Sequence, residues 1–81
     1  MKWSEKTQLK LLQTIRTYIV IRDEPVSARE LWEFLTFNKK LNLPEFINQS
    51  SMTRYLNDKI YSKTHKGLKS RKVGRTWYYE I

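Results

Sequence analysis

The sequence of 81 residues predicts an α+β fold, a bundle of three helices followed by a C-terminal β-hairpin. Two observations predict the helices: apolar residues recur at helical spacing in three segments, and capping residues precede those segments. A third observation predicts the hairpin, because two β-compatible runs are separated only by Gly74-Arg75. Globular domains usually contain roughly 100–200 residues. We therefore expect a single domain over residues 1–81.

The first helix is predicted from about residue 4 to residue 21. Ser4 is a suitable N-cap, and the carboxylate of Glu5 is favourable near the positive end of the helix dipole. The buried face is expected to comprise Leu11, Leu12, Ile15, Tyr18 and Ile19, with Leu9 and Val20 widening the apolar surface. Asp23-Glu24-Pro25 is expected to end the helix, because proline disfavours a helical residue before it.

Val26 is expected to form a short extended step before the second helix. Ser27 and Glu30 form a capping-box pattern, in which the serine hydroxyl caps the Glu30 amide and the glutamate reaches back to the serine amide. The helix is expected to end near Phe37 and to bury a face that comprises Ala28, Leu31, Trp32, Phe34 and Leu35. Residues 38–46 are polar, contain Pro44 and are predicted to form a loop.

A third helix is predicted from Ser50 or Ser51 to about His65, with Gly67 as the left-handed residue that closes it. Residues 68–73 and 76–81 then form the strands of the hairpin, with Gly74-Arg75 as a tight type II′ turn. Alternation along the strands predicts inward positions for Leu68, Trp77, Tyr79 and Ile81. It predicts that the exposed face or the tip carries Lys69, Arg71, Lys72 and Arg75.

The positive charge is concentrated in the C-terminal third of the chain. The formal net charge is +8, and the segment from Arg54 to Arg75 contains eight basic residues against Asp58 alone. Such asymmetry is typical of a protein that binds a polyanion, most often nucleic acid, because each neutralised phosphate releases counterions. The alternative interpretation is a solvated face that keeps a small protein soluble.

A polar row on the third helix has the chemistry of a major-groove reader. Four polar residues share one face of this helix: Ser50, Arg54, Asn57 and Tyr61. Thr53 flanks this row, and Ser51 in the same helix is a further candidate contact. In a major groove, Arg forks onto guanine and Asn onto adenine, while Ser and Tyr suit phosphates. The alternative is an ordinary solvent-exposed face on which Arg54 pairs with Asp58 four residues later.

The hairpin supplies a second set of candidate DNA contacts. Its basic residues are expected to grip phosphates or to enter the minor groove, and Tyr78 is the better candidate than Trp77 for a surface contact. This second set comprises Lys69, Arg71, Lys72, Arg75 and Tyr78. Alternatively, the aromatic run of the last strand stacks unpaired bases, as in proteins that bind single strands.

Two segments resemble known families. Ile47-Asn48-Gln49-Ser50-Ser51-Met52-Thr53-Arg54-Tyr55-Leu56-Asn57 resembles the recognition-helix segment of helix-turn-helix proteins. Residues 68–81 resemble the wing of ArsR-like and related winged-helix regulators, in which basic residues precede Gly-Arg and an aromatic strand ends in an aliphatic residue. The resemblance implies a winged helix-turn-helix fold, sequence-specific binding of duplex DNA and a role in transcriptional regulation. The loop over residues 38–46 is longer than the turn of a compact helix-turn-helix.

Two alternative functions remain open. The C-terminal end is also similar to the small winged domains of phage and viral primase-helicases, which implies a replication accessory of a phage or mobile element that binds single-stranded or forked DNA. The second alternative is that the chain is a winged helix that binds another protein. ArsR-like and MarR-like repressors dimerise through flanking helices, so a homodimer of this chain would have to use the first helix.

Several other classes are excluded by composition. There is no cysteine and only one histidine, His65, which is expected to favour the dipole at the end of the third helix. We therefore expect no metal and no cofactor. No close pair of acids accompanies a nucleophile, so we expect no enzymatic activity. No run approaches the roughly 18 apolar residues of a membrane span. The expected location is the cytoplasm, on the nucleoid when bound to DNA, or the host-cell cytoplasm if the protein is viral.

Overall fold

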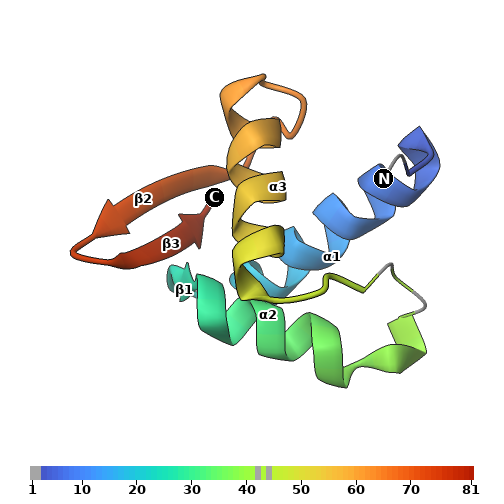
Figure 1. The fold of residues 1–81 in the computed structure, drawn as a ribbon, viewed down its shortest axis with the longest axis horizontal. Helices are drawn as coiled ribbons and strands as arrows, with labels where there is room; N and C mark the ends of the chain where they lie inside the picture. Colours follow the sequence, from blue (N-terminus) through green and yellow to red (C-terminus); the bar gives the residue numbers. More distant parts are fainter. Residues whose placement is uncertain (1–2, 42, 44) are drawn as a thin grey trace.

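A computed structural model describes residues 3–41, 43 and 45–81. The elements in chain order are α1 (Glu5–Arg22), β1 (Val26–Ser27), α2 (Ala28–Phe37), the short 3-10 helix η1 (Lys39–Leu41), α3 (Gln49–Tyr61), β2 (Lys69–Val73) and β3 (Thr76–Glu80). Figure 1 shows α3 at the centre, with the hairpin of β2 and β3 extending to one side and most of α1 on the other. The described residues therefore form an α+β fold with three α-helices and a three-stranded antiparallel sheet, which confirms the predicted class at that level.

Side-chain caps fix where the helices begin. Ser4 accepts a hydrogen bond from the amide of Thr7, and Ser27 accepts one from the amide of Glu30 at 3.1 Å, so both predicted N-caps are confirmed. The helix α3 begins at Gln49, slightly earlier than predicted, because Asn48 caps it through the amide of Ser51. Asn was overlooked as the cap although it is as good an N-cap as serine.

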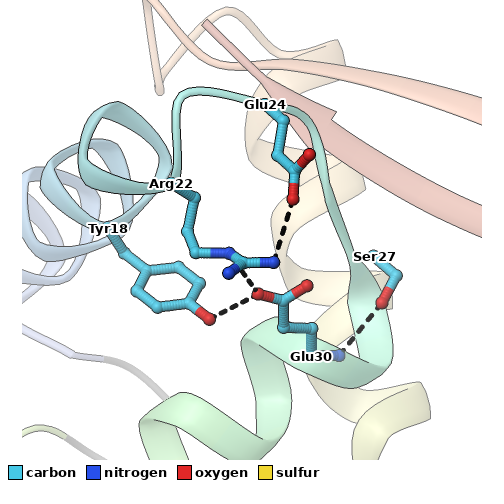
Figure 2. A network of polar contacts seen from close by, with 5 residues as sticks. All are labelled: Tyr18, Arg22, Glu24, Ser27 and Glu30. Carbon is cyan, nitrogen blue, oxygen red and sulfur yellow. Dashed lines mark hydrogen bonds and ion pairs between the residues drawn. The ribbon is translucent and has the colours of Figure 1, made fainter.

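The capping box at the start of α2 is only half formed. Figure 2 shows the carboxylate of Glu30 turned toward α1, where it accepts a hydrogen bond from Tyr18 and pairs with Arg22 at 3.0 Å. Arg22 also pairs with Glu24 at 2.9 Å, so one guanidinium joins two carboxylates. Burial, and then the bond to Glu30, raise the pKa of Tyr18. Instead of closing its own helix end, Glu30 ties α2 to the last turns of α1.

The third helix is shorter than predicted. It ends at Tyr61, and Lys63 takes the left-handed conformation (φ 62) that the prediction assigned to Gly67. The amide of Lys63 donates to the carbonyl of Ile60, and the amide of Thr64 donates to that of Lys59, so the last turn is closed without a glycine. Gly67 (φ 88) belongs instead to the turn that leads into β2.

The sheet joins the first part of the chain to the last. Its strand order is β1-β3-β2, with Val26 opposite Tyr79 and Lys69 opposite Glu80. Gly74 has φ 62 whereas Arg75 has a negative φ, which is the pattern of the predicted type II′ turn. The extended step at Val26 was predicted, but its pairing with the hairpin was not. Strand pairing over such a separation leaves no local sequence signal.

The core lies between the three helices and the inner face of the sheet. It comprises Leu11, Leu12, Ile15, Ile19, Val26, Ala28, Leu31, Met52, Leu56, Leu68 and Tyr79. Tyr18 and Trp77 pack against this core but are only partly buried. Ile81 is 46% exposed, so its predicted inward position is wrong, since β3 and the sheet end at Glu80. No helix in the described part of the chain is long and apolar enough to cross a membrane.

His65 is buried, with 3% of its surface exposed, in the turn after α3. Its ring meets the edge of Tyr55, with the two centroids 5.8 Å apart. Burial, and then the charge of Lys59, lower its pKa from the ordinary 6.5, which favours the neutral ring. The predicted role as a cation at the end of the helix is therefore wrong, because α3 ends four residues earlier.

The lowered pKa of His65 predicts a loss of stability in mild acid. A folded-state pKa below the ordinary value means that the contribution of the neutral ring is present above about pH 6.5 and is lost as the pH falls through the folded pKa. We expect the free energy of unfolding to fall more steeply below about pH 6.5 in the wild type than in His65→Gln. Urea denaturation between about pH 7 and pH 5 measures this, and parallel curves would contradict it.

Candidate nucleic-acid interface

The predicted polar row lies on the outer side of α3. Met52 and Leu56 are fully buried and anchor the helix to the core. Ser50, Arg54 and Tyr61 are exposed, and Tyr61 is 89% exposed, so it contributes little to packing. Three residues of the predicted set are only partly exposed: Ser51, Thr53 and Asn57. The row is therefore present, but its members differ in how freely they can reach a ligand.

Asn57 is bonded to the hairpin. Its side-chain carbonyl accepts a hydrogen bond of 3.1 Å from the hydroxyl of Tyr79, a residue with no exposed surface on β3. Sequence reasoning placed Tyr79 inward but missed this bond. The signal was an inward tyrosine, whose hydroxyl needs a partner when it is buried.

The two faces of the hairpin differ in what they present. The register sets Ser70 opposite Tyr79 and Lys72 opposite Trp77, so these four residues share the inner face, which meets α3 at Asn57. Lys69, Arg71 and Tyr78 belong to the outer face, away from Asn57. The structure thus brings only part of the predicted hairpin set to the side of α3.

The free end of the hairpin is exposed and basic. The ammonium nitrogen of Lys72 lies 5.8 Å from the centroid of the Trp77 ring, which it covers from the same face. Arg75 occupies the second position of the turn and is exposed. A cation over an aromatic face is held in place without being neutralised. Lys72 therefore keeps its charge available to an anion.

The described ion pairs lie away from α3 and the hairpin. The ion pairs Arg22–Glu24 and Arg22–Glu30 lie at the junction of α1 and α2, and Arg29–Glu33 lies within α2. Arg54 and Asp58 are four residues apart on α3, but no ion pair between them is found in the described part of the chain. The positive charge of α3 and the hairpin is therefore left to the solvent or to a ligand.

The long loop after α2 is anchored on the other side of α3. Phe46 packs against Trp3 and Tyr55, with ring centroids 5.1 and 5.6 Å apart, and Trp3 lies 4.9 Å from Tyr55. Lys59 lies 5.5 Å from the centroid of the Tyr55 ring. This aromatic cluster braces α3 despite the length of the loop, and it leaves the polar row uncovered. Pro44, within the predicted loop, lies outside the described residues.

The outer side of α1 exposes apolar residues on the helix that a homodimer was expected to use. Val20 and Ile21 are 64% and 75% exposed, and they border a shallow hollow together with Arg16 and Ile81. Leu9 is also exposed, so it does not extend the buried face. Within the described residues, no three histidine, aspartate or glutamate side chains come together as they would around a metal ion.

Comparison of the chain with protein-family models, with curated proteins and with solved structures found no match.

The burial of Tyr79 predicts a stability change in alkali. Burial raises its pKa from 10.0 to about 12, against a smaller lowering by the bond from Thr53. The stabilising neutral form is therefore fully present below about pH 10 and is lost as the pH rises through about 12. Relative to Tyr79→Phe, the wild type should lose about 1 kcal/mol of unfolding free energy between about pH 8 and pH 11.

Urea denaturation of both proteins at the two pH values measures this change. The two proteins differ only in this hydroxyl, so the difference between them isolates Tyr79. An unchanged difference between wild type and variant would show that the hydroxyl is not buried as described.

Proposed function

We propose that the chain is a winged-helix domain that binds specific sequences in duplex DNA and acts in transcriptional regulation. In this proposal α3 enters the major groove and the hairpin is the wing. The element order α1-β1-α2-α3-β2-β3 and the sheet order β1-β3-β2 are compatible with that fold. The proposed activity is binding alone, without catalysis, cofactor or metal.

The observation that carries the proposal is an uncompensated positive surface on one helix and the adjoining hairpin. Arg54, Lys72 and Arg75 are exposed, and the described ion pairs lie at the end of α1 and in α2, away from α3 and the hairpin. Exposed charge without a partner on the protein is available for phosphates and base edges. The bond between Tyr79 and Asn57 holds the two basic elements together, so they can act as one interface.

The two elements have different tasks in this proposal. An α-helix fits the major groove, which is about 12 Å wide, and Arg54 on its outer face has the forked donors that match guanine. Ser50 and Tyr61 are exposed on the same side and suit phosphates at the edges of the groove. Lys72 and Arg75 at the free end of the hairpin are suited to phosphates or the minor groove.

One observation favours a second candidate, the binding of single-stranded or forked DNA. Trp77 is partly exposed beneath Lys72, and an aromatic ring beside a cation is the pair on which unpaired bases stack. Competition between a duplex and a single strand of equal length at fixed salt separates the two candidates. Stronger retention of the single strand, lost in Trp77→Ala, would favour the second.

Loss of the Arg54 side chain should relax sequence preference. We expect Arg54→Ala to cost roughly 1–3 kcal/mol on the preferred duplex and much less on a random duplex, because a forked base contact is lost. Titration of both duplexes at one salt concentration measures the two affinities. Equal affinity of Arg54→Ala and the wild type for the preferred duplex would sink the assignment of α3 as the reading helix.

Loss of charge at the free end of the hairpin should weaken binding to every sequence. We expect Lys72→Ala and Arg75→Ala each to reduce the slope of log affinity against log salt by about 1, since each removes one phosphate contact. Lys10→Ala is the matched control, because it removes an exposed charge on α1, which Figure 1 places across α3 from the hairpin. Slopes that fall equally in all three variants would argue against a defined wing.

Retention of DNA at low ionic strength is the first experiment for the whole proposal. Wild-type protein without salt-dependent retention on any nucleic acid would instead favour a module that binds another protein.

A further inference from the structure

Asn57 is held differently from the rest of the polar row on α3. Ser50, Arg54 and Tyr61 are exposed, whereas the carbonyl oxygen of Asn57 is bonded to the buried hydroxyl of Tyr79. A buried hydroxyl that loses its partner leaves an unsatisfied polar group, which is costly. The bond therefore constrains which atoms of Asn57 remain for a ligand.

The direction of the bond follows from the acceptor. The side-chain oxygen of Asn57 is a carbonyl oxygen and carries no hydrogen, so it can only accept. The hydroxyl of Tyr79 therefore donates its proton to the carbonyl oxygen of Asn57, 3.1 Å away.

This bond constrains the orientation of the Asn57 carboxamide. A carboxamide is planar, and its oxygen has two acceptor positions, one on the side of the amino group and one on the opposite side. The buried hydroxyl of Tyr79 occupies one of these positions and holds the oxygen against the hairpin. Asn57 can then offer a ligand both of its N–H donors but at most one acceptor position.

From this geometry we propose that Asn57 is a specificity residue that acts chiefly as a hydrogen-bond donor and selects guanine over adenine. The inference rests on the proposed binding of α3 in the major groove. Bidentate recognition of adenine requires the carboxamide to accept from N6 and to donate to N7 at the same time, and the accepting oxygen is already held by Tyr79. Guanine presents only acceptors there, O6 and N7, which suit an amino group.

The neighbouring residue strengthens the same preference. Arg54 lies three residues before Asn57, one helical turn away, and its guanidinium has donors only. Two side chains that present donors one turn apart face two nearby base pairs, so we expect two guanines within the recognised site. Tyr79 itself never touches the DNA in this arrangement and acts as a positioning residue through Asn57.

Selection from a random duplex library tests the proposal with Tyr79→Phe, Asn57→Ala and Asn57→Asp beside the wild type. In the wild type, one base pair should prefer guanine about tenfold and should lose that preference in Asn57→Ala. Tyr79→Phe frees the carboxamide to rotate, so this base pair alone should shift from guanine toward adenine. Asn57→Asp keeps an acceptor for Tyr79 and replaces the donors, so the preference should move to cytosine, which presents a donor.

Tyr18→Phe is the matched control, because it removes a hydroxyl that donates to Glu30, outside α3 and the hairpin. Its base profile should equal that of the wild type. An adenine preference in the wild type at the position sensitive to Asn57→Ala would overturn the proposal. An unchanged base profile in a folded Tyr79→Phe would also overturn it. If Tyr79→Phe does not fold, the base preference of Asn57→Asp gives an independent answer. The absence of any preferred duplex would instead refute the proposed function itself.

Discussion

Tyr79 lies where the three parts of the fold meet. Its backbone pairs with Val26 on β1, its ring is fully buried in the core, and its hydroxyl reaches Asn57 on α3. A two-stranded hairpin is only marginally stable by itself. The third strand and the buried tyrosine therefore hold the hairpin against the bundle. The relative position of α3 and the hairpin, on which any joint interface depends, follows from this one residue.

The paired and the unpaired charges occupy different parts of the fold. The acids Glu24 and Glu30 are paired with Arg22 at the junction of α1 and α2, and Glu33 is paired with Arg29 within α2. The bases of α3 and the hairpin lack such partners among the described residues. Structural ion pairs and the unpaired positive field are thus separated in space. A surface organised in this way keeps its attraction for an anion while the fold still uses salt bridges.

Local chemistry explains which features could be predicted from the sequence. The Ser4 and Ser27 caps, the Gly74-Arg75 turn and the buried stripe of α1 depend on residues a few positions apart, and all are confirmed. The errors involve competition or distance. Lys63, and not Gly67, is the left-handed residue that closes α3. The carboxylate of Glu30 pairs with Arg22 of α1 and does not cap its own helix. His65 is buried by segments that meet only in the folded chain. For the candidate interface, helical spacing predicted the exposed row, but the capture of Asn57 by Tyr79 joins residues 22 apart.

The pairing of β1 with β3 also has a consequence for the order in which the molecule forms. Val26 and Tyr79 are more than fifty residues apart, so their contact closes a long loop, whereas the hairpin and each helix need only local contacts. We expect docking of the hairpin to be a late step in folding and its reversal to be an early step in local opening. Such an opening separates Tyr79 from Asn57, so the orientation of one partly exposed carboxamide depends on a pairing of strands that lie far apart in the sequence.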